Sequence, residues 1–205
     1  MNVAQAIEHR RSVKHYDPNH VMPEVDFARL MQLAKLSPSS FNIQNYRFVN
    51  VKDKELRKQI RGAAWDQAQI TDASVLLAVC ADLNAHKDQP ARYWQHVPEA
   101  VRDFMVSHVT PFYEGKPQLT RDEGIRSTAF AGMAIMLAAV EMGYETGPLI
   151  GFDPVAVGKI LNLPENIILS YLLVIGKPTK AAWPRGDRLP DSEVLITDKF
   201  SGKHQ

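Results

Sequence analysis

The stretch Val75-Leu76-Leu77-Ala78-Val79-Cys80-Ala81 contains no polar side chain that would interrupt it. A strand with one solvent-facing side alternates apolar and polar residues, so a run without alternation predicts a strand buried on both faces. A second buried strand is predicted from Ile167 to Ile175. A sheet buried on both faces requires helices on both sides, and the sequence therefore predicts one α+β domain, residues 1–205, around a small central sheet.

The flanking elements follow from periodicity and capping signals. Pro23 opens a helix that ends before Pro38, and Asp53 and Asp153 are predicted helix caps. Between residues 83 and 120, four prolines are expected to interrupt any helix, which leaves a helical excursion with irregular ends. The remaining predicted elements are a first helix from about Val3, a strand over Tyr46–Val51, a buried helix over 121–142 ending at Gly143, and a short strand over Glu193–Thr197.

Composition excludes several classes of protein. The chain has 24 Lys+Arg against 23 Asp+Glu and a net charge of +1, which argues against a nucleic-acid partner. Its single cysteine, Cys80, permits no internal disulfide and suits a reducing cytosol. The charged N-terminus does not resemble a signal peptide, and the apolar run 130–140 is short for a membrane span, so we expect a soluble cytoplasmic protein.

Known nucleotide and metal motifs are missing from the sequence. No G-x-G-x-x-G or P-loop occurs, and the seven histidines show no paired metal spacing, so we predict no metal site. Three polar clusters remain, each of which could also be an ordinary turn. They are Arg10-Arg11-Ser12-Val13-Lys14, Ser39-Ser40-Phe41-Asn42-Ile43-Gln44, and the loop that carries Arg185 and Arg188.

Taken together and in order, these segments resemble the flavin-dependent nitroreductase family along nearly the whole chain. The resemblance rests on the entry motif 10–17, the turn Pro38–Gln44 followed by Tyr46-Arg47-Phe48, and Asp66-Gln67-Ala68-Gln69. It continues through Gly147-Pro148-Leu149-Ile150-Gly151-Phe152-Asp153 and ends with Arg185-Gly186-Asp187-Arg188-Leu189-Pro190. The resemblance implies a nitroreductase-like fold with a mostly antiparallel sheet, and a C-terminal strand that adds to the partner's sheet in a homodimer.

The resemblance also implies a cofactor site for FMN at the dimer interface. Arg10 and Arg188 match phosphate ligands, with Arg185 as a helper, and Lys14 matches a cation that tunes the flavin ring, so no side chain is assigned as a catalytic acid or base. Backbone N–H groups of Ile150 and Gly151 match donors to the ring. The expected cofactor-binding set is completed by Arg11, Ser12, Pro38, Ser39, Ser40, Asn42, Gln44, Asp66, Gln67 and Gln69.

The activity implied is ping-pong hydride transfer from NADH or NADPH through flavin N5 to nitroaromatic, quinone or related small acceptors. The aromatic residues between Tyr93 and Tyr113 are predicted to supply either a substrate-facing lid or ordinary core. Two alternatives stay open at this level. One is a specialised reductase, dehalogenase or dehydrogenase for one metabolite, and the other is a flavin-binding protein that stores or senses FMN without turnover.

Overall fold

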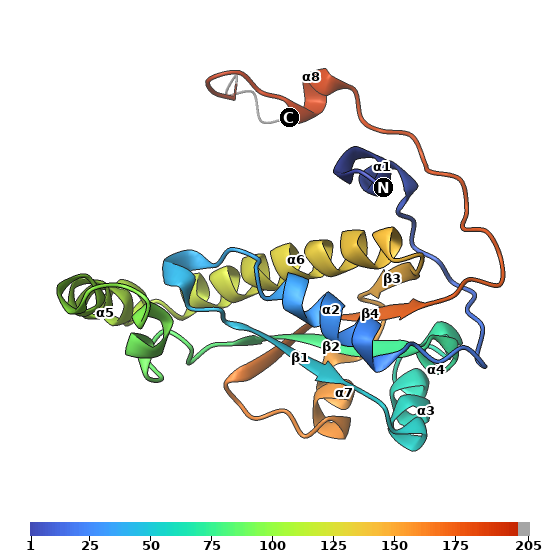
Figure 1. Ribbon diagram of the computed structural model, residues 1–205, viewed down its shortest axis with the longest axis horizontal. Coiled ribbons are helices and arrows are strands. Elements are labelled where there is room, and N and C mark those ends of the chain that lie inside the picture. Colours follow the sequence, from blue (N-terminus) through green and yellow to red (C-terminus); the bar gives the residue numbers. More distant parts are fainter. Residues whose placement is uncertain (201–205) are drawn as a thin grey trace.

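Four strands form one antiparallel sheet in the order β1-β2-β4-β3 (Figure 1). The computed structural model describes residues 1–200. The small antiparallel sheet expected from the sequence is confirmed. The strands are β1 Tyr46–Asn50, β2 Val75–Asp82, β3 Glu145–Leu149 and β4 Ile167–Gly176. The helices are α1 Val3–His9, α2 Glu24–Ala34, α3 Lys54–Gly62, α4 Gln69–Asp72, α5 Glu99–Tyr113, α6 Pro117–Glu141, α7 Pro154–Ile160 and α8 Asp191–Val194, with 3-10 turns η1 Ser40–Asn42 and η2 Pro90–Trp94.

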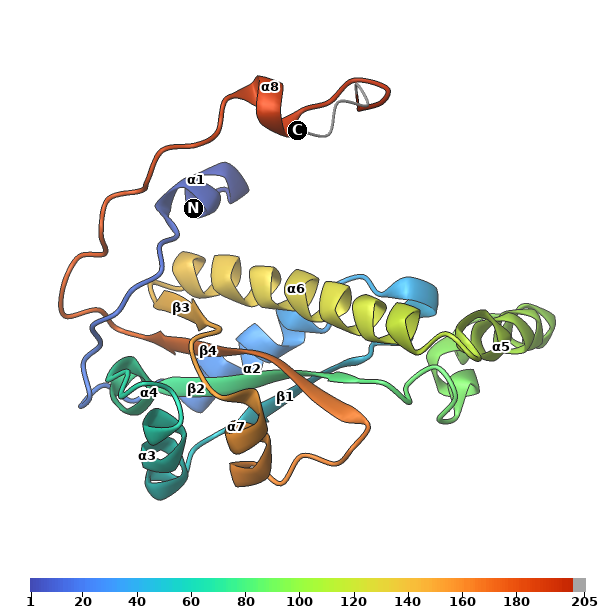
Figure 2. The same ribbon diagram turned by 180° about the vertical axis from the view of Figure 1, so that it is seen from behind.

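Strand β2 is buried along its whole length, as its sequence predicts. Leu76 and Ala78 face one hydrophobic cluster, whereas Leu77 and Val79 face another on the opposite side. Helices α3, α4 and α7 contribute to the first cluster, and α2 and α6 to the second (Figure 2). The sheet is therefore the middle layer between two sets of helices, because alternate side chains of its central strands are apolar on both faces.

Three helix starts lie where capping signals predict them. Helix α2 begins after Pro23. The carboxylate of Asp53 accepts a hydrogen bond from a backbone N–H in the first turn of α3, and that of Asp153 accepts two in α7. Gly143 follows the end of α6 with a φ of 77°, a left-handed conformation that glycine adopts without steric cost.

Strand β3 was not predicted. Its sequence, Glu145-Thr146-Gly147-Pro148-Leu149, contains the two residues that are least favourable in strands. The strand forms because it lies at the edge of the sheet and pairs with β4, and an edge strand needs ladder hydrogen bonds on one side only. Tertiary position thus overrides the local preference.

One further prediction is wrong, and a second is not met within a single chain. Pro111 does not interrupt a helix but lies inside α5, close enough to its C-terminal end that only the last turn is affected. The strand predicted over Glu193–Thr197 is not formed in this chain, where α8 occupies Asp191–Val194. A strand needs a neighbouring edge, and this segment lies on an arm that leads away from the sheet (Figure 1).

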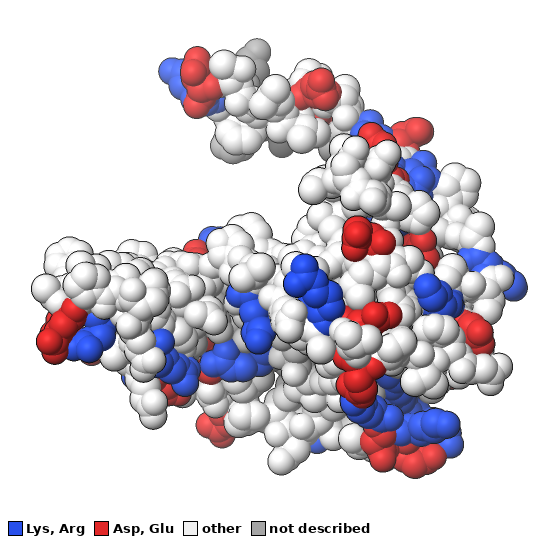
Figure 3. Space-filling view, viewed as in Figure 1, with Lys and Arg blue, Asp and Glu red and all other residues white. Residues whose placement is uncertain are grey.

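Helix α6 is the buried central helix that the sequence predicts. By length and composition it is the one helix in the described residues that could cross a membrane, but Ile135 and Ala139 are fully buried in the core against the sheet. Its other side is apolar and open, with Phe130 53% and Met133 36% exposed. The arm after β4 stands above this side and leaves a hollow between itself and the body (Figure 3).

Candidate functional site

Residues 10–14 form an extended segment that is attached to β3. Ser12 forms a parallel bridge with Thr146, and the Val13 N–H donates to the Thr146 carbonyl at 3.0 Å. A side chain at Gly147 would meet the Val13 carbonyl oxygen at 2.8 Å, so this close approach requires glycine. Val13 is buried, and the alternation of an extended chain leaves Ser12 and Lys14 exposed together.

Four guanidinium groups gather where α1 ends. Arg185 donates from one terminal nitrogen to the carbonyls of Ile7, Glu8 and Arg10, at 3.1, 3.0 and 2.9 Å. Desolvation, and then the positive charges of Arg11, Arg188 and Arg10, lower the pKa of Arg185. No carboxylate pairs with any of the four within residues 1–200. The structure therefore brings together the predicted arginines as a cluster without a counter-ion, which suits an anion.

A second group joins the end of α3 to the segment after β3. The Gln67 side-chain amide donates to the carbonyl of Gly151 at 2.6 Å and to that of Ala64 at 3.1 Å. Its oxygen accepts from the Gln69 amide at 2.9 Å. Gln69 is 6% exposed. Three predicted residues, Gln67, Gln69 and Gly151, thus lie in one hydrogen-bonded group.

Asp66 lies outside this group although it is adjacent in sequence. Its carboxylate is 82% exposed and pairs with the Arg61 guanidinium at 2.6 Å, and this hydrogen bond lowers the pKa of Asp66. Trp65, the residue before Asp66, lies close to the group instead. The indole lies against Gly151, where an added side chain would approach Trp65 within 2.6 Å, and it is 77% exposed.

Sequence reasoning missed Trp65. The available signal was a tryptophan directly before the Asp66–Gln69 motif. Trp65 and Asp66 both have positive φ, 53° and 56°, and such strained backbone often occurs at binding sites.

Ile150 and Gly151 present backbone donors. The Ile150 side chain is 82% exposed, and its carbonyl accepts from the Phe152 N–H at 3.0 Å. In the described part of the chain, neither the Ile150 nor the Gly151 N–H has a backbone acceptor outside the sheet ladder. Both donors are therefore available to a ligand at the end of β3.

The third group is the turn 38–44. Ser39 accepts a hydrogen bond from the Gln44 N–H at 2.9 Å, and the Asn42 amide donates to the Tyr93 carbonyl at 3.2 Å. Phe41, Asn42 and Gln44 all have positive φ between 43° and 53°. Asparagine tolerates this conformation, but Phe41 and Gln44 adopt it only because the surrounding contacts hold them.

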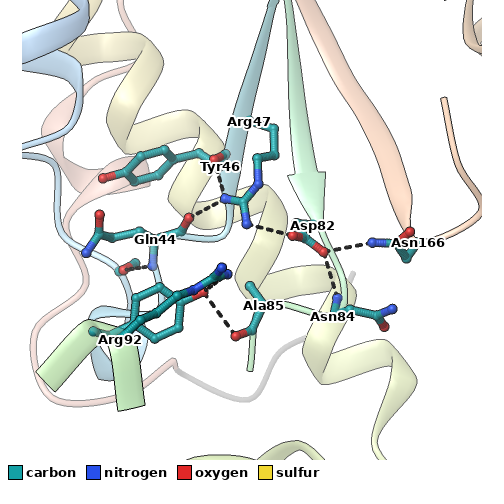
Figure 4. A network of polar contacts seen from close by, with 10 residues as sticks. Gln44, Tyr46, Arg47, Asp82, Asn84, Ala85, Arg92 and Asn166 are labelled. Atoms are coloured by element: carbon teal, nitrogen blue, oxygen red, sulfur yellow. Dashed lines mark hydrogen bonds and ion pairs between the residues drawn. The ribbon is translucent and has the colours of Figure 1, made fainter. Parts of the chain in front are cut away.

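Arg47 supplies much of that support (Figure 4). It donates to the carbonyl of Gln44 at 2.7 Å and pairs with Asp82 at 2.6 Å. The other oxygen of Asp82 accepts from the Asn166 amide and the Asn84 N–H, at 3.0 and 2.9 Å. The network ties the turn to β1, β2 and the start of β4.

The turn and the arginine cluster lie at opposite ends of α6. Ile43 packs in a cluster with Leu119, in the first turn of that helix. His9, at the end of α1, contacts Glu145, just after the helix ends, and Figures 1 and 2 show α1 over the same end. A helix of 25 residues spans roughly 35 Å. Within one chain, these two groups of predicted residues therefore do not meet.

Comparisons with known proteins show the family of this chain. The model of the nitroreductase family matches residues 7–177. Protein DrgA of Synechocystis sp. is 44% identical over 89% of this chain and 87% of its own length, and MhqN of Bacillus subtilis, named as a candidate NAD(P)H nitroreductase, is 33% identical over 92% and 95%. A candidate nitroreductase of Exiguobacterium sibiricum, crystallised with FMN, superposes with a TM-score of 0.89 at 26% identity over 96% and 97% of the two chains.

Proposed function

Because this chain belongs to the nitroreductase family, we propose that it is an FMN-dependent oxidoreductase that takes electrons from NADH or NADPH and passes them to a small acceptor. The observation that carries this proposal is the arginine cluster at one end of β3, which has no carboxylate partner within residues 1–200, together with backbone donors at the other end that have no acceptor in the same residues. Six residue steps from Glu145 to Gly151 correspond to about 20 Å of extended chain. An elongated cofactor with a phosphate at one end and a polar ring at the other fits such a span.

At the phosphate end, Arg10 and Arg188 are proposed as direct ligands. Arginine binds phosphate through paired, charge-assisted hydrogen bonds. One terminal nitrogen of Arg185 already donates to the backbone carbonyls at the end of α1. Its proposed role is therefore to hold the end of that helix and to add positive charge. Arg11 and the Ser12 hydroxyl complete this end.

At the ring end, Gln67, Gln69 and Gly151 are proposed to set the position of the flavin. Both N–H groups of the Gln67 amide are used within the protein, so Gln67 is a positioning residue. Within residues 1–200 the side-chain oxygen of Gln69 accepts no hydrogen bond, so it is proposed to accept one from a ring N–H. The N–H groups of Ile150 and Gly151 are proposed donors to ring acceptors. Lys14 has no ion-pair partner within residues 1–200, and its ammonium group favours negative charge on a nearby ring.

When bound, FMN supplies the redox chemistry by accepting a hydride from the nicotinamide and delivering electrons to the acceptor. We propose that donor and acceptor use the same open face in turn, in a ping-pong sequence, with nitroaromatics and quinones as acceptors. The exposed indole of Trp65, resting on Gly151, borders this face. Its contribution is an apolar wall beside the ring.

The site is proposed to be completed by a second copy of the chain. The turn with Pro38, Ser39, Ser40, Asn42 and Gln44 lies at the far end of α6, so it reaches the arginine cluster only from a partner placed antiparallel along that helix. The open side of α6, with Phe130 and Met133, and the exposed Val3 and Ile7 of α1 supply an apolar surface for this contact.

The C-terminal arm suits the same arrangement. Leu195 is 74% exposed and Val194 67%, so the arm has apolar side chains without a core to enter. One edge of the sheet, β3, already carries the bridge between Ser12 and Thr146, whereas the other edge, β1, has no neighbour in the described residues. We propose that residues 193–197 of one chain become a strand on β1 of the other.

An anaerobic visible spectrum tests the proposed activity. The purified protein should show flavin bands that bleach on addition of NADH or NADPH and return on addition of a quinone or a nitroaromatic compound. A protein that takes up no FMN would contradict the proposal, and one that binds FMN but never bleaches would instead be a storage or sensing protein.

Truncation after Pro190 tests the assembly. We expect the fraction of dimer and the bound FMN to fall to the same extent in the shortened protein. Light scattering after gel filtration measures the dimer, and absorbance measures the FMN. A shortened protein that remains a fully flavinated dimer would contradict the role of the arm.

A further inference from the structure

A cavity of about 470 Å³ lies between the start of α2 and the start of α3, and it shares no residue with the proposed flavin site. The loop before α2, the end of β1, the start of α3 and the start of β2 enclose it. Its apolar wall comes from Val21, Met22, Phe27 and Val75. A volume of this size is typical of small-molecule sites.

The polar part of the wall is strongly basic. Lys52, Lys54, Arg57 and Lys58 line the cavity, against one carboxylate, that of Glu24. Lys52 pairs with Glu24, and Lys58 pairs with Glu55. All four of these side chains are at least 65% exposed, so the two ion pairs contribute little to stability. Lys54 forms no ion pair in the part of the chain that the structure describes.

Arg57 is the unusual member of this set because it is 8% exposed. Three of its N–H groups donate to the carbonyls of Val51, Ala73 and Ser74, at 2.7, 2.5 and 3.1 Å. A guanidinium has five N–H groups, so two have no partner within residues 1–200. Burial lowers the pKa of Arg57, and no carboxylate in the described part of the chain forms an ion pair with it.

Lys54 is also placed unfavourably for the helix that it begins. It is the first residue of α3, where the helix dipole favours carboxylates and disfavours cations. A buried, unpaired guanidinium and a lysine at the positive end of a helix both become favourable when an anion lies between them. His20, whose Nδ1 is held by the Ser74 hydroxyl at 2.8 Å, adds a further polar group to the wall.

We propose that this cavity binds a small organic anion, with its phosphate or carboxylate at Lys54 and Arg57 and its apolar body against Met22 and Phe27. The site is separate from the redox centre and does not depend on the proposed activity. It lies at the end of α4, the four-residue helix that starts at Gln69, so an occupant contacts the same short segment that supplies the flavin site.

Isothermal titration of the FMN-loaded protein with phenyl phosphate and with benzoate tests the proposal, with benzyl alcohol as the neutral compound of similar shape. At least one anion should bind, and Lys54→Glu should lower the affinity for that anion by about tenfold or more. This variant suits the test because a glutamate at the first position of α3 favours the helix, so the protein should fold. The anion that binds identifies the headgroup.

Lys159→Glu, on the exposed side of α7, is the matched control and should leave the affinity unchanged. Binding that Lys54→Glu and Lys159→Glu reduce equally would reflect general charge and overturn the proposal. So would anion binding that neither variant affects, or a protein that binds benzyl alcohol as tightly as both anions. None of these results bears on whether the flavin bleaches with NADH or NADPH.

Discussion

The side-chain amide of Gln67 donates to the carbonyl oxygen of Gly151 at 2.6 Å and so joins segments that are 84 residues apart. Its second hydrogen bond, to Ala64, and the contact with Gln69 leave it no freedom to turn. The carbonyl of Gly151 is therefore anchored, while its N–H has no backbone acceptor outside the sheet ladder in the described residues. This relationship makes the backbone at the end of β3 a rigid donor for the proposed cofactor.

Replacement of Gly151 tests how closely this group is packed. In Gly151→Ala the new methyl group would meet Trp65 at 2.6 Å and the Gln67 amide nitrogen at 3.3 Å. We expect the indole to shift, with altered tryptophan fluorescence and weaker FMN binding. Unchanged fluorescence and unchanged affinity would show that Trp65 does not rest on this glycine in solution.

Gly158→Ala is the matched control for that substitution. Gly158 lies inside α7, and a methyl group there meets no atom within 4 Å. The variant should be more stable by about 0.5–1 kcal/mol, because alanine has less conformational entropy to lose in a helix. Urea denaturation measures this difference, and a destabilised variant would contradict the open space at this position.

Arg10→Ala should weaken FMN binding by removing a charge-assisted phosphate contact, an effect on the order of 1.5–3 kcal/mol. Titration of the apoprotein with FMN, followed by the quenching of flavin fluorescence, gives the dissociation constant. Lys159→Ala removes an exposed cation elsewhere and should leave the constant unchanged. Equal affinities of Arg10→Ala and wild type would remove Arg10 from the site.

Asp153→Ala should destabilise the protein by about 1 kcal/mol, because the carboxylate caps α7 through the N–H groups of Val155 and Ala156. Asp153→Asn keeps a side-chain oxygen for the cap, so its free energy of unfolding should fall much less. Urea denaturation compares the two variants. If both are destabilised equally, the charge of Asp153 rather than its hydrogen bonds supports the helix.

The stability of the protein at alkaline pH should depend on Tyr144. Its hydroxyl donates to Asp26 at 2.5 Å, and burial, followed by that carboxylate, raises the pKa of Tyr144 to about 12. Because the folded pKa lies above the ordinary value of 10.0, the contribution of the neutral hydroxyl is complete below pH 10.0 and is lost as the pH rises through about 12.

Tyr144→Phe should therefore be less stable than wild type near neutral pH, with a difference that shrinks above about pH 10. Unfolding in urea at a series of pH values measures the free energy of both proteins. A difference that stays constant up to about pH 12 would mean that Tyr144 titrates normally in the folded state.

Features that depend on neighbouring residues were predictable from the sequence. The unbroken apolar run of β2, the helix caps Asp53 and Asp153, and Gly143 after α6 each depend on residues within one strand or one turn. The resemblance to the nitroreductase family rests on such local motifs and is confirmed by the family model over residues 7–177.

Contacts between distant segments were not predictable. Nothing near Asp66 indicates that it turns to Arg61 rather than toward Gln67, and nothing near Arg185 indicates that its nitrogen holds the carbonyls of α1. Strand β3 forms despite Gly147 and Pro148 because β4 lies beside it. Residues 193–197 do not form a strand, because no edge lies beside them in this chain.

The sequence by itself determined the layered α+β fold, the family and the types of residue available for a cofactor, because apolar periodicity and capping act over short distances along the chain. Only the tertiary structure decided which of those residues meet. It gathered the arginines at the end of α1, locked Gln67 onto Gly151 and placed the turn 38–44 at the far end of α6. The physical reason is that side-chain partners are chosen by packing in space, across separations that no local pattern records.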